Sequence, residues 1–281
     1  MLKQRIITAV LMLAVLIPSV WAQDSRAFVV ITAAMIGAGA WEWSRLCGWG
    51  GARAWLAGAL TALACALCWW GGLAQANLFG LWALVGAAWV LVAARYLAMG
   101  VDSWAAVAPA LRLAVGLVAL VSAWLALVQA RLLGINFLFS VLVLVWGADV
   151  AAYFCGRFLG GRWIERKLAV RISPGKTWEG ALGGLLAVLL IAFVWQAQEA
   201  GADWGAPSLY TRLFSSGTLF AVVAVVFLTT MSVAGDLLES LFKRAAGVKD
   251  SSALLPGHGG VLDRVDALLP VLPLALLVCT A

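Results

Sequence analysis

The feature that most constrains this chain is a series of apolar segments, each about as long as a membrane is thick. A helix needs roughly 20 apolar residues to cross the hydrocarbon core. Lipid offers the backbone no hydrogen-bond partners, so helices are the expected element. We therefore predict an all-α fold, a polytopic transmembrane helix bundle with about nine transmembrane helices. The predicted segments are roughly 6–22, 27–43, 54–71, 78–94, 111–129, 133–154, 180–197, 216–235 and 265–281.

Composition supports a membrane protein and explains the positive charge. The 281 residues are 64% hydrophobic and 11% charged, against about 25% charged residues in soluble domains. If the N-terminus is cytoplasmic and all nine segments cross, 16 of the 19 lysines and arginines lie on the cytoplasmic side, as the positive-inside rule requires. The net charge of +6 then needs no nucleic-acid partner. We expect a bacterial plasma (inner) membrane, with the charged clusters of the C-terminal half facing the cytoplasm.

Two features at the N-terminal end leave alternatives open. The first segment, MLKQRIITAVLMLAVLIPSVWAQD, also has the basic start, short apolar run and small-residue site of a cleaved signal peptide. Its removal would leave the orientation of the other segments unchanged. We expect 1–130 to support the fold and face lipid, and 131–281 to hold the catalytic region. Gly37 and Gly39 permit close helix contact, so a homodimer is a further expectation.

The five cysteines do not predict a zinc site. Cys65 and Cys68 form a CxxC pair inside an apolar segment, and the only histidine, His258, lies far along the chain. Zinc sites need four ligands. These cysteines are expected to fill space as apolar side chains.

Ionisable residues in lipid are costly and usually face a polar cavity or a partner, and four places in the C-terminal half carry them. The first is Asp149, about 24 Å along its predicted helix at 1.5 Å per residue, with Tyr153 one turn later. A simple interfacial ion pair with Arg157 is the alternative. The second is SPGKTWEG, where Ser173 is predicted to cap a helix and Lys176 to offer a phosphate seat. An ordinary capped helix entry is the alternative here.

The third and fourth places lie in and after the segment 216–235. Asp236, Glu239, Ser240 and Lys243 follow helical spacing and form one polar stripe, which could also be an ordinary solvated helix exit. Further on, Asp263 and Asp266 are expected to share one face of the first turns of the last helix. The glycines before them, Gly257, Gly259 and Gly260, are expected to leave backbone N–H groups free for a ligand. Favourable placement of acids at a helix N-terminus is the alternative.

The four places together predict a chemistry. Carboxylates suited to Mg²⁺ lie beside lysines and arginines suited to phosphate oxygens. This combination is typical of phosphoryl or nucleotidyl transfer, in which metal and cations neutralise charge on the transition state.

The run Ser240–Asp266, SLFKRAAGVKDSSALLPGHGGVLDRVD, resembles the signature of the phosphatidate cytidylyltransferases (CDP-diacylglycerol synthases). DVAAYFCGRFLGGR and SPGKTWEG resemble further segments of that family in the same order, so the resemblance spans about residues 140–270. The pair Glu42-Trp43 also matches. The chain departs from the pattern at Val150, where the family carries a small hydroxyl residue, and at Gly175, where a second lysine is usual.

The resemblance implies a membrane enzyme that joins phosphatidate and CTP to give CDP-diacylglycerol and pyrophosphate with Mg²⁺, alone or with a second cation. It implies Asp236 and Asp263 as metal ligands. The predicted catalytic residues are Asp149, Lys243, Asp263 and Asp266, and the predicted substrate-binding residues are Ser173, Lys176, Arg244, Lys249, His258, Gly259, Gly260 and Arg264.

Other functions remain open on the sequence alone. Another CTP-using lipid enzyme, such as a polyprenol kinase or a CDP-archaeol synthase, would share the carboxylates and lysines. A transporter would use buried charges as an ion path, but it should spread them across the bilayer rather than gather them at one face. A scaffold leaves the intramembrane acids unexplained.

Overall fold

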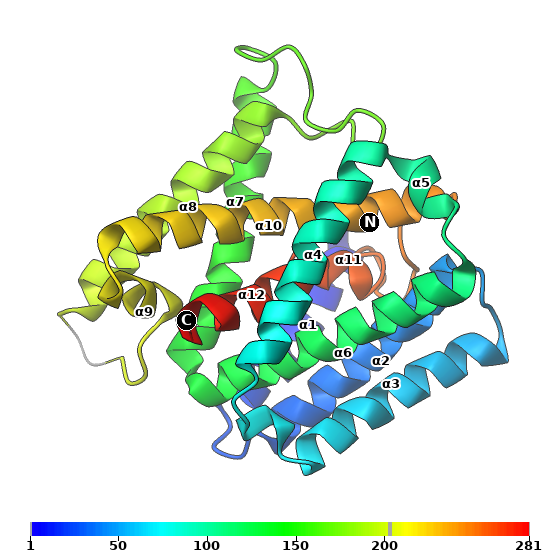
Figure 1. Cartoon of the computed structure of the whole chain (residues 1–281), viewed down its shortest axis with the longest axis horizontal. Helices are drawn as coiled ribbons and strands as arrows, with labels where there is room; N and C mark the ends of the chain where they lie inside the picture. Colours follow the sequence, from blue (N-terminus) through cyan, green and yellow to red (C-terminus); the bar gives the residue numbers. More distant parts are fainter. Residues whose placement is uncertain (1, 202–203, 281) are drawn as a thin grey trace.

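The computed structural model describes residues 2–201 and 204–280, and within them the regular elements are all helices (Figure 1). Their apolar composition and the need to close backbone hydrogen bonds in lipid favour this outcome. The helices are α1 Leu2–Trp21, α2 Arg26–Leu46, α3 Ala52–Trp70, η1 Leu73–Gln75, α4 Phe79–Met99, α5 Val101–Ala105, α6 Pro109–Leu133, α7 Ile135–Leu159, α8 Trp178–Glu199, α9 Leu209–Ser215, α10 Thr218–Ala245, α11 Leu262–Val265 and α12 Leu268–Thr280.

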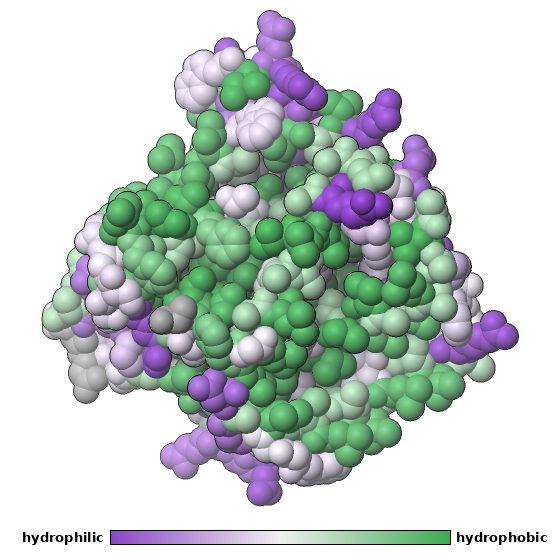
Figure 2. All heavy atoms as spheres, viewed as in Figure 1, coloured by the Kyte–Doolittle hydropathy of each residue, from purple (hydrophilic) through white to green (hydrophobic). Residues whose placement is uncertain are grey.

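Seven of the helices in the described residues are long and apolar enough to cross a membrane: α2, α3, α4, α6, α7, α8 and α10. The chain is therefore a multi-pass helical membrane protein, as predicted. The terminal helices are shorter, since the apolar part of α1 is Ile6–Trp21 and α12 has 13 residues. The count of about nine crossings stays a prediction. Hydrophobic side chains cover most of the face in Figure 2, with hydrophilic ones at its margins.

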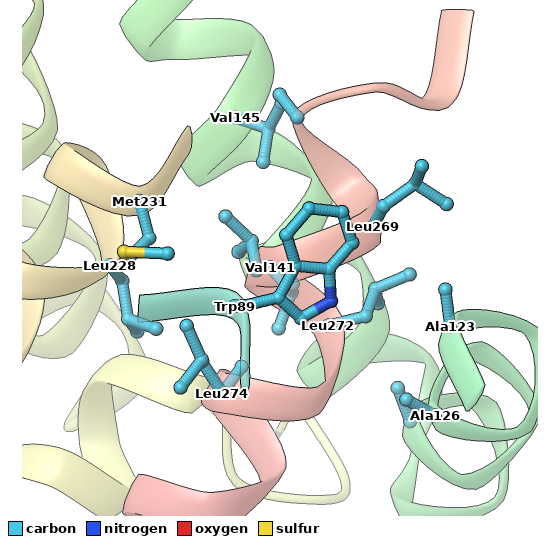
Figure 3. Packing of buried hydrophobic residues seen from close by; sticks show 14 of the residues in the cluster. Trp89, Ala123, Ala126, Val141, Val145, Leu228, Met231, Leu269, Leu272 and Leu274 are labelled. Carbon is cyan, nitrogen blue, oxygen red and sulfur yellow. The ribbon is translucent and has the colours of Figure 1, made fainter. Parts of the chain in front are cut away.

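The short last helix, α12, forms the centre of the bundle. It packs against α4, α6, α7 and α10, and every residue from Leu269 to Leu276 is buried. Figure 3 shows Leu272 of α12 among side chains of those helices, including Trp89, Ala123, Val141 and Met231. In lipid, close packing of this kind holds helices together, because the hydrophobic effect that drives helix association in water is absent. Since α4 and α6 enclose α12, the regions 1–130 and 131–281 share one core. Their division into support and catalysis stays a prediction.

The predicted segment 265–281 does not form one helix with the acids in its first turns. Leu262–Val265 is a separate short helix, Asp266 ends it, and α12 begins at Leu268. Asp266 and Ala267 separate the two helices, which places this acid at their junction.

Glycines let the helices approach closely inside the chain. A Cβ on Gly58 of α3 would lie 2.7 Å from the carbonyl oxygen of Gly37 in α2. A Cβ on Gly39 would lie 3.4 Å from the side chain of Leu262. Both glycines that raised the expectation of a homodimer therefore face other parts of the same chain. A homodimer remains a prediction, but its surface must come from other residues.

Candidate active site

Lys176 and Asp236 form the first ion pair of the site. Lys176 Nζ donates to Asp236 Oδ2, and both side chains are about three-quarters buried. Asp236 lies in α10, while Lys176 ends the loop before α8. That loop closes on itself, because Ser173 N–H donates to the Ala169 carbonyl (2.8 Å) and Leu168 N–H to the Lys176 carbonyl (3.1 Å). These turns bring the lysine over α10.

The predicted helix start at Ser173 is wrong. The helix begins at Trp178, and Thr177 is its N-cap, with the hydroxyl accepting from Gly180 N–H at 3.1 Å. The backbone around Ser173 is already committed to the closed loop, so its hydroxyl does not cap the helix. The role of Ser173 in substrate binding stays a prediction.

Asp149 lies on the exposed side of α7, facing the first ion pair. The charges of Asp236 and Lys176 both act on it. An ion pair between Asp149 and Arg157 does not occur among the residues that the structure describes. The simpler interfacial pairing considered for this acid is therefore not the arrangement in the structure, and Asp149 belongs to the site cluster.

Lys243 is the centre of a second, more deeply buried ion cluster. Its Nζ pairs with Glu239 one turn earlier on α10 and with Asp263 Oδ1 at 2.5 Å. The side chains of Lys243, Glu239 and Asp263 are 12%, 6% and 6% exposed. Two carboxylates share one ammonium group, so the predicted polar stripe on α10 continues into α11.

Both oxygens of Asp263 are engaged. Oδ1 accepts from Lys243, while Oδ2 accepts from Gly260 N–H (2.7 Å), the Ser251 hydroxyl (2.9 Å) and Ser251 N–H (3.0 Å). Burial alone would raise the pKa of Asp263, but these donors and the charge of Lys243 outweigh it and lower the pKa to about 2. Asp263 is therefore a fixed negative charge at neutral pH.

The glycine loop, residues 257–260, packs closely against Asp263 of the same chain. Gly259 has a positive φ of 81°, which only glycine adopts readily, and a Cβ there would lie 2.6 Å from Asp263 Oδ2. Gly260 donates its N–H to the same oxygen. The expectation that Gly260 leaves this group free for a ligand is therefore wrong. In contrast, Nδ1 of His258 is buried without a hydrogen-bond partner, so a ligand could accept or donate there.

The other predicted residues lie around these two clusters. Asp266 Oδ1 accepts from Ala267 N–H at 2.7 Å, and the charges of Asp236 and Asp149 act on the carboxylate. Arg244 donates to the Ile172 and Val248 carbonyls at 3.5 and 3.2 Å, which links two loops. Lys249 and Arg264 are exposed and form no ion pair within the described residues, so both are free to bind phosphate.

Two buried glutamates that hold loops by hydrogen bonds were not predicted as site residues. Glu42 of α2 is fully buried and holds the loop before α11. Glu179 of α8 is buried, and its Oε1 accepts from the backbone N–H groups of Gly161, Trp163 and Ile164. Each acid lies at the end of an apolar segment. The cost of placing a carboxylate there is the signal that would have found Glu42 in the N-terminal half.

An apolar cavity of about 430 Å³ ends at the ionic cluster. Its walls come mainly from α4 and α6, and include Leu84 and Val118, whose side chains are 69% and 64% exposed on the outer surface. Glu239 and Asp266 contribute to its lining. The cavity is thus an almost wholly apolar space that lies against two acids of the site, which fits the apolar part of an amphipathic ligand.

The fit of a divalent cation differs between the acids. No three His, Cys, Asp or Glu side chains of the described residues converge closely enough to form a ready-made metal site. Asp236, Asp149 and Asp266 interact through their charges, and carboxylate oxygens are the ligands that Mg²⁺ prefers. These three acids therefore fit a cation in their chemistry. Asp263 fits it less well, because four donors already occupy its oxygens.

Together these features define a class: a multi-pass helical membrane protein whose clustered acids and lysines lie next to an apolar cavity. The chain belongs to the cytidylyltransferase family, whose model matches residues 3–281. A phosphatidate cytidylyltransferase of Pseudomonas aeruginosa is 40% identical over 97% of this chain and 95% of that protein. Proteins of the same name from Haemophilus influenzae and Bacillus subtilis are 46% and 40% identical, each over 50% of this chain and over 44% and 46% of their own lengths.

Proposed function

We propose that this chain transfers the cytidylyl group of CTP to phosphatidate, giving CDP-diacylglycerol and pyrophosphate. The observation that carries the proposal is an apolar cavity lined at one place by Glu239 and Asp266. Glu239 pairs with Lys243, and the charge of Asp236 acts on Asp266, so both lysine–aspartate pairs lie next to these two acids. Phosphatidate cannot leave the bilayer and CTP cannot enter it, so a catalyst must join an apolar space to a charged one. The relatives' names give the same reaction.

The basic residues would hold the phosphates. Lys176 belongs to the less deeply buried of the two ion pairs. Arg244, Lys249 and Arg264 are exposed around it. A triphosphate could approach from the aqueous side and replace Asp236 as the partner of Lys176. Cations at such positions neutralise the charge that builds up as phosphoryl groups react.

The cavity would hold part of the lipid. Its apolar walls suit an acyl chain, and its inner end lies beside Glu239 and Asp266. An acyl chain in this cavity would leave the lipid phosphate close to the two ion pairs. The walls of α4 and α6 open toward the lipid-facing surface through exposed apolar side chains, which gives the substrate a route from the bilayer.

The reaction needs no strong general base. The phosphate of phosphatidate is already an anion near neutral pH, and one of its oxygens would attack the α-phosphorus of CTP. The new bond forms between that oxygen and the α-phosphorus while the bond to the bridging oxygen of the β-phosphate breaks, and pyrophosphate leaves. The residues would therefore act by positioning and charge neutralisation. This agrees with a chain that has one histidine.

We propose Mg²⁺ as the cofactor, held by Asp236 with Asp149 and Asp266 close by. When bound, it would neutralise phosphate charge between the two substrates. Asp236 is the best placed of the predicted ligands, because Lys176 is its one hydrogen-bond partner among the described residues. Asp263 would have to release a donor to join it. We also propose that the site faces the cytoplasm of a bacterial inner membrane, where CTP is available.

The deciding experiment follows the label of CTP marked at the α-phosphorus, using the purified chain in nanodiscs that contain phosphatidate. Label in the lipid, dependent on Mg²⁺, is expected. Diacylglycerol in place of phosphatidate is the control, because it lacks the attacking phosphate. Lipid that gains label only from γ-labelled CTP would indicate a lipid kinase and contradict the proposal.

A further inference from the structure

Glu42 is buried among hydrogen-bond donors that come from a distant part of the chain. It lies in α2 and is 0% exposed. Its Oε1 accepts from the Ser252 hydroxyl (2.6 Å) and Val261 N–H (2.9 Å), and its Oε2 from the Ser251 hydroxyl (3.1 Å) and Leu262 N–H (2.8 Å). Each oxygen therefore accepts one hydroxyl and one backbone group, across more than 200 residues of sequence.

These four contacts clamp the two ends of the loop that carries the glycines. Ser251 and Ser252 begin the loop, and Val261 and Leu262 end it at the start of α11. The first N–H groups of a helix have no partner within it, so Glu42 caps α11 from a neighbouring helix. Gly260 passes so close that a Cβ would overlap Glu42 and Ser251. The loop has room for this path only with glycine there.

The clamp continues to the ionic cluster. Ser251 also contacts Asp263 Oδ2, through its N–H at 3.0 Å and its hydroxyl at 2.9 Å, and Asp263 pairs with Lys243. The hydroxyl has one hydrogen to share between Glu42 and Asp263, while the N–H always remains for Asp263. A contiguous series thus runs from Glu42 through Ser251 and Asp263 to Lys243.

We propose that Glu42 is a positioning residue of the reaction: it fixes the 251–262 loop and thereby the placement of Asp263 and Lys243 at the site. This rests on the proposed function. Glu42 lies behind the loop and is fully buried, so it does not touch the substrates. The N-terminal region, expected only to support the fold, supplies this residue.

The test substitutes Glu42→Gln in the full chain. A glutamine replaces one acceptor oxygen with an NH₂ group, which would face a backbone N–H that can only donate. Glu199→Gln is the matched control. Glu199 likewise accepts hydrogen bonds from an amide, a backbone N–H and a hydroxyl, namely those of Asn136, Ser208 and Thr211, and it contacts none of the site residues.

We expect kcat to fall at least about 10-fold in Glu42→Gln, with the KM for CTP changing less, because the clamp orders a site that can still bind nucleotide. Hydrogen exchange should accelerate selectively in residues 251–262. Glu199→Gln should change neither. Ser252→Ala removes one donor to Oε1 and should give a smaller effect of the same kind, which keeps the test available if Glu42→Gln does not fold.

Normal kcat in Glu42→Gln, or faster exchange throughout the protein with equal losses in the Glu199→Gln control, would overturn the positioning role. Absence of turnover by the unsubstituted chain would instead contradict the proposed function, because the exchange measurement tests the clamp without any reaction.

Discussion

The two lysine–aspartate pairs of the site have the same chemistry and opposite surroundings. The Lys176–Asp236 pair is 26% and 28% exposed, and Lys176 is the donor to Asp236. The Lys243–Asp263 pair is 12% and 6% exposed, and Asp263 accepts from four donors. The first pair can exchange its partner for a ligand at small cost, while the second is held in place by the protein. The site thus combines one pair that a ligand can reach, Lys176–Asp236, with one that is held in place, Lys243–Asp263.

The largest effect is expected from Asp263→Asn. It removes one of the two carboxylates that share the Lys243 ammonium group and puts an amide beside donors on the loop. Breaking a buried pair costs about 3–5 kcal/mol, so we expect a large drop in unfolding temperature together with a loss of kcat of at least about 10³-fold, beyond the about 10²–10³-fold typical of one electrostatic group. Turnover assays and thermal unfolding in detergent check both. Near-normal activity would remove Asp263 from the site.

Asp236→Asn should separate activity from stability. We expect kcat to fall about 10²–10³-fold, while the free energy of unfolding changes by less than about 1 kcal/mol, as for partly exposed pairs. The same two measurements apply, with Asp24→Asn as the control, because Asp24 forms an exposed pair with Arg26 away from the site. A stability loss as large as that of Asp263→Asn would contradict the inference that the Lys176–Asp236 pair contributes less to stability than the Lys243–Asp263 pair.

Lys176→Ala should act mainly on CTP binding. The lysine is available to a phosphate, so its loss should raise the KM for CTP about 10-fold, which corresponds to about 1.4 kcal/mol, and leave insertion intact. Steady-state kinetics over a range of CTP concentrations test this. An unchanged KM with lower kcat would mean that Lys176 serves Asp236 rather than the nucleotide.

The smallest effect concerns pH. The pKa of Asp263 is lowered to about 2, below the value of about 3.9 for an unfolded aspartate. Its stabilising contribution is therefore fully present above pH of about 4 and is lost as pH falls through about 2. The difference in unfolding temperature between Asp263→Asn and the unsubstituted chain should stay constant from pH 8 to pH 5. A difference that shrinks within that range would contradict the strong engagement of this carboxylate.

Much of the site could be predicted from the sequence, because ionisable residues are costly and therefore rare in apolar segments. Asp149, Asp236, Lys243 and Asp263 stood out as ionisable residues at the ends of apolar segments, and the structure brings them together. The helix start at Ser173 was wrong because turn hydrogen bonds in the preceding loop displaced it to Trp178. The prediction that Gly260 leaves its N–H free for a ligand is wrong because this N–H donates a hydrogen bond to Asp263 of the same chain.

By itself, the sequence determined that the chain is a helical membrane protein and which acids must find polar partners. Both follow from local composition, since the cost of exposing backbone or charge to lipid does not depend on the rest of the fold. The tertiary structure decided which lysine pairs with which aspartate, and that Glu42 reaches Ser251 and Leu262. Hydrogen bonds between segments so far apart depend on how helices pack, and no periodicity within one segment carries that information.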